Sequence, residues 1–263
     1  MFEKKIGESF PEISHKRIDS PRKDVYYNHI HNHCEILLFI SGEANYNIDG
    51  QVYSPQAFDL LFIPAGTYHY LIPTASVPYE NYVLGIDPKK IPAPHYQALF
   101  TPPFMVNIKD DRESKSFFKR LDLYSEIFTD DDFRSTGQML VLEFITYLSY
   151  QKRNMRSVHC GSIHHIDKII SYITDHLEEK LDAEAIAAHF YLSASYVQNL
   201  FCKNMHIGLK KYISQKKIYA AHADLSYGKS PSEVCEKYRF GDYSVFYRLY
   251  KKTFGVSPSR NKF

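Results

Sequence analysis

The sequence predicts an α+β protein of more than one domain: an N-terminal β-barrel with helices after it, and then an all-α region. Three observations support this prediction. Up to about residue 110, apolar residues form short runs or alternate with polar ones, which is typical of strands. From about Ser114 they recur at helical spacing. The chain then ends in two successive helix-turn-helix patterns, joined by one connector helix.

Turn signals bound the predicted strands. Cys34–Ile40 is an apolar run that ends at Ser41-Gly42, and Ala44–Ile48 alternates apolar with polar residues. Asp49-Gly50 favours a type I′ hairpin turn, because both central residues of that turn need positive φ. Many short strands with regular turns indicate a small barrel or sandwich. Further strands are expected at 58–63, 79–86 and 104–108.

The next segment is predicted to be helical. A long helix is expected over 133–150, with Asp130, Asp131 and Asp132 before it as a cap. The residues after this helix are polar and have no clear period. We therefore expect a β-barrel over 1–110, a helical dimerisation segment over 111–153, a linker over 154–162 and a helical domain over 163–263.

Composition excludes several classes of protein. Hydrophobic residues make up 44% of the chain and charged residues 24%, as in ordinary globular proteins. No apolar run approaches the ~18 residues of a membrane span, and no secretory signal is visible, so a cytoplasmic location is expected. No Cys-x-x-Cys pair occurs, which predicts reduced thiols. The cysteines are Cys34, Cys160, Cys202 and Cys235.

Charge is distributed unevenly along the chain. Residues 1–159 hold 17 Lys and Arg against 20 Asp and Glu, a net charge of −3. Residues 160–263 hold 15 against 10, a net charge of +5. The basic half is the half that contains the helix-turn-helix patterns. Positive charge there suits contacts to DNA phosphates.

Each helix-turn-helix pattern ends on a helix that Ser193 or Asp242 is expected to cap. The second helix of such a unit lies in the major groove of DNA, where Gln or Asn recognises adenine and Arg recognises guanine. The other interpretation is that the polar faces are solvated surfaces of a helical bundle. The inner faces are expected to be apolar, from Val197, Leu200 and Phe201 in the first unit and Phe246, Leu249 and Tyr250 in the second.

The connector helix is predicted over 209–227. At a rise of 1.5 Å per residue, ~18 residues span about 27 Å, whereas successive major grooves on one face of DNA lie about 34 Å apart. A rigid connector of this length suits two recognition helices in adjacent grooves. Double-stranded DNA is therefore the predicted partner.

The segment 163–263 resembles the DNA-binding domain of the AraC/XylS family of transcription regulators. The resemblance rests on Leu192-Ser193 with Phe201, on Tyr212-Ile213 and Ile218, on Phe240, Phe246 and Lys251, and on the closing Phe254-Gly255-Val256-Ser257-Pro258. It implies that one domain reads two adjacent grooves. The implied DNA-binding residues are Ser195, Gln198, Asn199, Lys203, Lys217, Tyr243, Ser244, Tyr247, Arg248 and Lys251.

Three positions depart from the pattern of the family. Arg239 stands before Phe240 where the family usually has Gly, and a left-handed conformation there would cost about 1 kcal/mol. His206 replaces the Gly usual after the first recognition helix. Lys217 replaces the usual Arg of the connector and so lacks the planar fork that grips phosphate.

Two histidine-bearing segments stand out in the N-terminal half. Because residues i, i+2 and i+4 share a strand face, His31, His33 and Glu35 are expected to point into one pocket, with His69 arriving from a second strand. These segments resemble the two motifs of a cupin barrel, the usual N-terminal domain of the sugar-responsive branch of the AraC family. Nearby tyrosines suit stacking on a sugar ring. The candidate effector-binding residues are His31, His33, Glu35, Tyr46, Tyr68 and His69.

These residues have three interpretations: they bind an organic effector, hold a transition metal as in catalytic cupins, or only pack the barrel. In catalytic cupins the corresponding Glu stands several residues further along the chain than Glu35 does here. The sugar-responsive branch of the AraC family usually binds an organic effector without metal. We therefore expect an effector site with no metal and no cofactor.

The sequence as a whole predicts a sequence-specific, DNA-binding transcription regulator and not an enzyme. By resemblance it is an activator that responds to a sugar or related small molecule and contacts RNA polymerase. The helix over 133–150 is expected to form a homodimer contact, although packing on the barrel would explain it equally. The alternative is a metal-dependent cupin enzyme fused to a DNA-binding module.

Overall fold

The structure, a computed structural model, describes residues 2–6, 10–21, 29–101, 104–152 and 165–260. The chain divides into two compact units, Met1–Gly161 and Ser162–Phe263. The first combines strands with helices and the second is helical, which confirms the predicted fold class. The predicted linker 154–162 lies outside the described residues.

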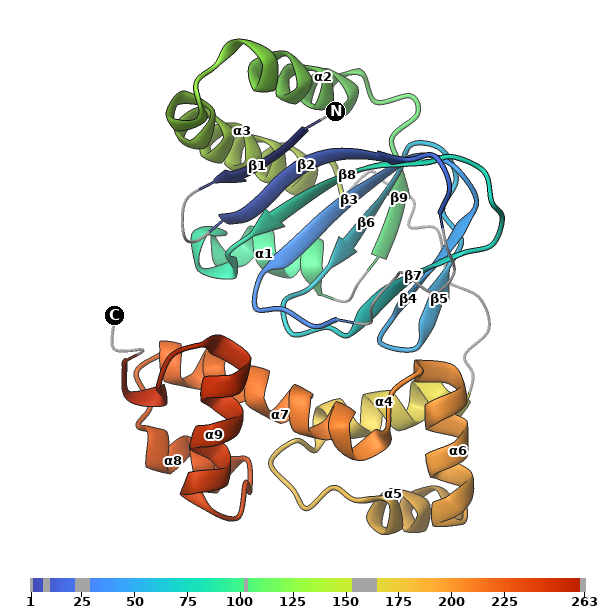
Figure 1. Cartoon of the computed structure of the whole chain (residues 1–263), viewed down its shortest axis with the longest axis vertical. Coiled ribbons are helices and arrows are strands. Elements are labelled where there is room, and N and C mark those ends of the chain that lie inside the picture. Colours follow the sequence, from blue (N-terminus) through green and yellow to red (C-terminus); the bar gives the residue numbers. More distant parts are fainter. Residues whose placement is uncertain (1, 7–9, 22–28, 102–103, 153–164, 261–263) are drawn as a thin grey trace. The chain divides into compact units, whose positions relative to one another are not determined.

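Two antiparallel sheets form the β part of the first unit (Figure 1). The larger sheet has the strand order β1-β2-β8-β3-β6-β9 and the smaller one the order β5-β4-β7. The strands are β1 (Phe2–Ile6), β2 (Phe10–Ile18), β3 (Cys34–Ser41), β4 (Ala44–Ile48), β5 (Gln51–Tyr53), β6 (Asp59–Ile63), β7 (His69–Pro73), β8 (Tyr79–Ile86) and β9 (Phe104–Asn107).

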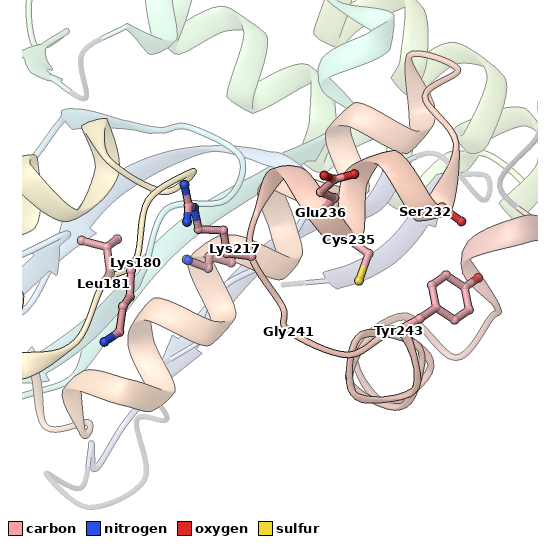
Figure 2. A pocket seen from close by; sticks show the side chains of 9 residues that line it. Lys180, Leu181, Lys217, Ser232, Cys235, Glu236, Gly241 and Tyr243 are labelled. Atoms are coloured by element: carbon pink, nitrogen blue, oxygen red, sulfur yellow. The ribbon is translucent and has the colours of Figure 1, made fainter.

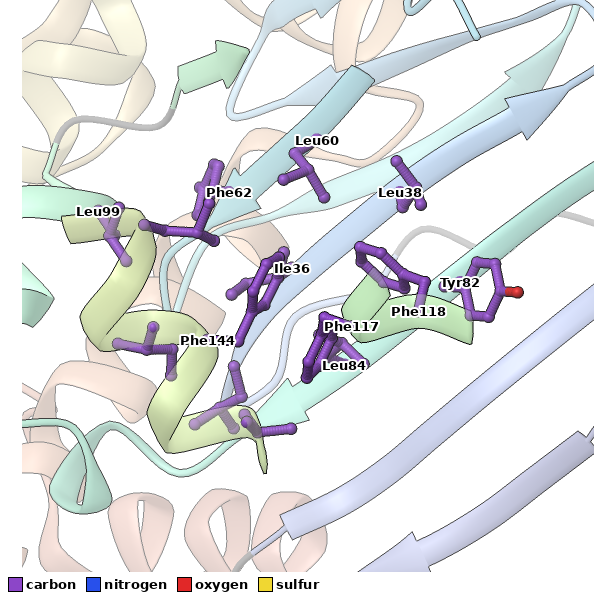
Figure 3. Close-up of a cluster of buried hydrophobic side chains, with 14 of the residues drawn as sticks. Ile36, Leu38, Leu60, Phe62, Tyr82, Leu84, Leu99, Phe117, Phe118 and Phe144 are labelled. Carbon is purple, nitrogen blue, oxygen red and sulfur yellow. The ribbon is translucent and has the colours of Figure 1, made fainter. Parts of the chain in front are cut away.

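Helices cover one face of the larger sheet. They are α1 (Ala93–Phe100), α2 (Arg112–Ile127) and α3 (Asp130–Gln151), and a 3-10 turn, η1 (Pro88–Lys90), precedes them. Figure 3 shows Ile36, Leu38 and Phe62 of the sheet facing Phe117 and Phe144 of the helices. The rings of Phe117 and Phe144 stack with centroids 4.0 Å apart. The helices and the sheet therefore share one hydrophobic core.

A second core lies between the two sheets. Side chains of β3 alternate, so Leu37 and Phe39 face this core while Ile36 and Leu38 face the helices. Glu35 falls on the inner face with Leu37 and Phe39. Both faces of β3 are thus covered, which explains why its sequence reads as a continuous apolar run and leaves Glu35 as the charged exception.

The second unit consists of α4 (His165–Asp175), α5 (Ala183–Phe190), α6 (Ala194–Met205), α7 (Leu209–Ser226), α8 (Pro231–Lys237) and α9 (Tyr243–Phe254), with a 3-10 turn, η2 (Pro258–Arg260), after them. The helices α5 and α6 form the first helix-turn-helix unit, and α8 and α9 the second. Figure 1 shows α7 running between them. The predicted connector over 209–227 is thus found at 209–226.

The structure corrects three expectations about the first unit. Residues 93–100 form α1 inside the range predicted to be all β, because an eight-residue helix with Pro94 in its first turn is too short to show a period. The strands β1, β2, β5 and β7 were not predicted. The cap of α3 is Thr129, whose hydroxyl accepts from the Asp132 amide, and the three aspartates lie in the first turn of the helix.

Candidate functional site

The first recognition helix, α6, has the cap and the two faces that its sequence predicts. Ser193 Oγ accepts a hydrogen bond from the Tyr196 amide at 3.2 Å and so begins the helix. Val197 and Phe201 are fully buried, and Leu200 is half-buried. The outer face carries four exposed side chains among the predicted DNA contacts: Ser195, Gln198, Asn199 and Lys203.

The second recognition helix, α9, is built in the same way. Asp242 Oδ1 accepts from the amides of Ser244 at 2.6 Å and Val245 at 3.3 Å. Phe246 and Tyr250 are fully buried against α7 and α8. The predicted contacts Tyr243, Ser244, Arg248 and Lys251 are exposed, whereas Tyr247 is half-buried.

Non-glycine residues have left-handed backbone conformations at the ends of α5 and α6 and in the turn before α9. Arg239, which stands where the family usually has Gly, has φ 52°, and so has His206 after α6. Arg239 Nε donates to the Glu178 carbonyl at 2.9 Å, which fixes the turn before α9. The two positions where the family pattern has Gly are thus left-handed in the structure. A third, Tyr191 with φ 57°, carried no such signal.

Lys217 differs from the other predicted contacts. Its side chain is only 7% exposed, and Nζ donates to the Glu179 carbonyl at 2.9 Å. Burial, and then the charge of Arg239, lower the pKa of this ammonium group. A lysine held in this way ties α7 to the loop after α4, so it is poorly placed for a phosphate.

Lys217 also lines a cavity of about 630 Å³ beside the start of α9 (Figure 2). Burial raises the pKa of the Cys235 thiol in its wall, so this sulfur stays protonated and is a weak nucleophile. Three cationic side chains against one carboxylate, Glu236, give the lining a net positive charge. Its lining residues are Lys180, Leu181, Lys217, Ser232, Cys235, Glu236, Arg239, Gly241 and Tyr243.

In the first unit, four of the six candidate effector residues come together at one end of the sandwich. Glu35 is on the inner face of β3, and His69 begins β7 in the opposite sheet. His31 Nε2 lies 2.9 Å and His33 Nε2 3.6 Å from Glu35 Oε1. His69 Nε2 lies 3.2 Å from Glu35 Oε2. The imidazoles of His31 and His33 stack with their centroids 3.6 Å apart.

His29 belongs to this cluster and was missed by the sequence reasoning. Its backbone pairs with that of His69, N–H to carbonyl in both directions at 3.2 and 3.1 Å. Its ring stands edge-on to the His69 ring, at 4.3 Å between centroids. The spacing His29-x-His31-x-x-x-Glu35 is the signal that marks His29, and it overlaps the pair His31-x-His33 on which the prediction rests.

The electrostatics of the cluster favour an ionised Glu35 carboxylate beside a neutral His31 imidazole. Burial lowers the pKa of His31 to about 4, although the Glu35 charge opposes this. Burial alone would raise the pKa of Glu35, but the neighbouring imidazoles, His31 first, hold it well below its ordinary value. Burial opposes a proton on His69, while Glu35 raises the pKa of that imidazole.

The two candidate tyrosines are core residues. Tyr46 is on the inner face of β4, where its hydroxyl bonds the Tyr79 hydroxyl, and it is 3% exposed. Tyr68 packs edge-on to Tyr70, with centroids 6.1 Å apart, and is 1% exposed. Tyr68 lies just before β7, and its ring is enclosed by the protein. Neither tyrosine offers a free ring for stacking.

No helix in the described part of the chain is long and apolar enough to cross a membrane.

Two family models match the chain. An AraC-like ligand-binding domain matches residues 16–121, and a helix-turn-helix domain matches residues 186–262. The first match contains the histidine cluster and the second contains both recognition helices. The two functional regions of the structure are therefore the two regions that known families share.

Several regulatory proteins are similar to the chain. The arabinose operon regulatory protein of Salmonella typhimurium is 26% identical over 237 residues, which cover 84% of this chain and 80% of that protein. The regulatory protein PocR of the same species is 29% identical over 92 residues, or 35% of this chain. The chain spans only 30% of PocR, and 18% of the Bacillus subtilis regulator YtdP.

Among solved structures, apo ToxT from Vibrio cholerae is similar to the chain with a TM-score of 0.42 and 12% sequence identity. The superposition covers 98% of each chain.

Proposed function

Because this chain belongs to the AraC family of transcription regulators, we propose that it is an effector-responsive activator that reads two adjacent major grooves of DNA with one domain. It has a ligand-binding domain followed by a helix-turn-helix DNA-binding domain. The observation that carries the proposal is the matched pair of recognition helices, each capped, buried on one face and polar on the other.

The DNA contacts that we propose are the exposed side chains of the two recognition helices. Arg248 is suited to guanine, and Gln198 and Asn199 to adenine. Lys203 and Lys251 supply charge for phosphates. Lys217 is left out, because its ammonium group already binds the Glu179 carbonyl. The 18 residues of α7 span about 27 Å, which supports insertion of both recognition helices into adjacent major grooves at the same time.

For the effector, we propose a sugar or a related polar small molecule that contacts the cluster of His29, His31, His33, Glu35 and His69. Relatives that cover most of this chain support this class: they include the arabinose operon regulatory proteins and the lactose operon transcription activator of Staphylococcus xylosus. Imidazoles and a carboxylate suit hydroxyl groups as hydrogen-bond partners. Tyr46 and Tyr68 are left out, because both are core residues.

We also propose that the chain forms a homodimer through α2 and α3. Leu123 and Ile127, one turn apart on α2, are 50% and 60% exposed, and Met139 on α3 is 65% exposed. Exposed apolar groups of this kind mark interaction surfaces when they gather on neighbouring elements. Binding of the effector would then shift the population of dimers between arrangements that suit the DNA well or poorly.

A thermal-shift screen against a panel of sugars tests the effector, with a DNA-binding assay for each hit. A ligand at 100 times its Kd adds about 2.7 kcal/mol of stability, which gives a clear shift. We expect one class of sugar to stabilise the protein and to change its affinity for DNA. A panel without any stabilising sugar would contradict the sugar assignment, and a hit that leaves DNA affinity unchanged would contradict the regulation.

A further inference from the structure

The histidine cluster has the composition and the spacing of a metal site. One donor atom from each of His29, His31, Glu35 and His69 lies within 4.8 Å of the others. From this geometry we propose that these four residues bind one divalent transition-metal ion between the two sheets of the sandwich. The proposal replaces the expectation, made from the sequence, of an effector site with no metal.

The tautomers of two histidines are fixed by the backbone. His31 Nδ1 lies 2.8 Å from the His33 carbonyl, and His69 Nδ1 lies 3.0 Å from the Thr67 carbonyl. A carbonyl oxygen only accepts hydrogen bonds, so each Nδ1 must carry the proton. In the neutral imidazole the lone pair is then on Nε2. A hydrogen bond from the far ring nitrogen to a carbonyl is the arrangement that orients metal-binding histidines.

The Nε2 atoms of His31 and His69 have no hydrogen-bond donor facing them among the described residues. Each is buried, and among the described residues neither makes a well-directed hydrogen bond, although Glu35 lies 2.9 Å from one and 3.2 Å from the other. In the neutral imidazole, the lone pair on Nε2 faces the carboxylate at this distance and is repelled by it. A cation that binds all three groups removes this repulsion and satisfies both buried nitrogens.

Two separations within the set already agree with ligands of one ion, and the full set, within 4.8 Å, needs only a small contraction. Two donor atoms that are each about 2.1 Å from a metal lie roughly 3.0 to 3.4 Å apart when they are adjacent in its coordination shell. The observed separations of Nε2 from the Glu35 oxygens, 2.9 Å for His31 and 3.2 Å for His69, are close to that range. A hydrogen-bonded core would not need four donor atoms gathered in this way.

The donor set selects the class of ion. Three imidazoles and one carboxylate suit first-row transition ions such as Zn²⁺, Ni²⁺, Co²⁺ or Fe²⁺, whereas Mg²⁺ and Ca²⁺ prefer oxygen ligands. The set carries one negative charge against two positive charges on the ion, at a site where His29 is exposed and only His69 is fully buried. An ion that prefers six ligands would keep positions for oxygen atoms of a small molecule.

The test is a metal titration of the untagged full chain after removal of metal by a chelator. Zn²⁺ is titrated against a chromophoric chelator, and Co²⁺ is followed by its d–d absorption. We expect the wild type to bind one more equivalent of metal ion than His29→Ala, His69→Ala or Glu35→Gln. Each of these substitutions should weaken metal binding by more than about 100-fold. Glu35→Gln preserves the shape of the side chain, so it keeps the test valid if a histidine variant misfolds.

His33→Ala is the matched control. His33 lies on the same segment and stacks on His31, but it is outside the four-residue set, and the carbonyl that orients His31 remains in the variant. His33 Nε2 also lies 3.6 Å from Glu35 Oε1, so the variant should lose about 10- to 100-fold in affinity, as a residue that only supports a metal ligand does, and less than any of the three ligand variants. A wild type that takes up no ion, or an ion that is lost in His33→Ala but kept in His29→Ala, would overturn the proposal.

The inference does not rest on the proposed regulation, because its probe is the metal alone. DNA binding of the metal-free chain is measured beside the titration. If the chain binds DNA but never takes up an ion, only the metal proposal fails.

Discussion

His69 Nε2 lies 3.2 Å from Glu35 Oε2, and the two residues belong to opposite sheets of the sandwich. Both side chains point into the space between the sheets, at the end where His29 also pairs with His69. A ligand at this point contacts both sheets at once. Its binding energy is therefore available to change how the sheets pack, which is what an effector site in a regulator requires.

Arg248 gives the most direct test of the DNA contacts. Arg248→Ala should cost ~1–3 kcal/mol on the cognate site and relax the preference at one base pair, because a bidentate contact to guanine is lost. Fluorescence anisotropy on the cognate site and its single-base variants measures both effects. Non-specific DNA is the control, and its affinity should change little. Unchanged specificity in the variant would remove Arg248 from the list of base contacts.

Arg239 tests the strained turn before α9. Arg239→Gly should be more stable than Arg239→Ala by about 1 kcal/mol, because φ 52° costs Ala but not Gly. The comparison of these two variants cancels the loss of the hydrogen bond to Glu178, since neither has the guanidinium group. Urea denaturation of the full chain measures the difference. Equal stability would mean that the turn relaxes when the side chain changes.

Asp224 predicts a dependence of stability on pH. Its Oδ2 accepts from Lys237 Nζ at 2.8 Å, Lys229 Nζ at 3.0 Å and Tyr238 OH at 3.0 Å. Burial alone would raise the pKa of this carboxyl, but these donors lower it. A carboxyl with a lowered folded-state pKa stabilises the fold above its unfolded pKa of about 3.9, and the contribution is lost as the pH falls through the folded value.

Asp224→Asn should therefore destabilise the chain by roughly 1–2 kcal/mol at neutral pH, and the difference should shrink as the pH falls below about 4. Tyr238→Phe is the control, because it removes one donor of the same carboxylate and keeps the charge. Denaturant unfolding at a series of pH values gives the difference. A gap between wild type and Asp224→Asn that stays constant down to pH 3 would show that the carboxylate charge contributes nothing.

The proposed dimer contact predicts a change of mass. Leu123→Glu with Ile127→Glu should convert a dimer into a monomer, because four carboxylates would be buried in one apolar contact. Light scattering after size exclusion gives the mass. Val52→Glu, at an exposed apolar residue of β5, is the control and should leave the dimer intact. A double variant that remains dimeric would place the contact elsewhere.

Sequence reasoning predicted the local features of the helical unit well, because each depends on a few neighbouring residues. Ser193 and Asp242 cap their helices as predicted, and Arg239 has the left-handed conformation expected of a position that is usually Gly. The burial of Lys217 was not predictable, since it depends on the position of Glu179, 38 residues away.

In the first unit the sequence identified the histidine cluster but not its full membership. His31 and His33 lie against Glu35 as predicted, but local spacing does not say that His29 joins them. Its place there depends on the pairing of His29 with His69, a contact between distant segments.

The central claim is that one domain reads two adjacent grooves. The most direct measurement is selection of random DNA duplexes by the purified full chain, followed by sequencing of the bound fraction. The account predicts two blocks of preferred bases whose centres are about one helical turn, roughly 10 base pairs, apart. Arg248→Ala should lose preference in one block and keep the other. A single block, or no enrichment of any sequence, would contradict the account.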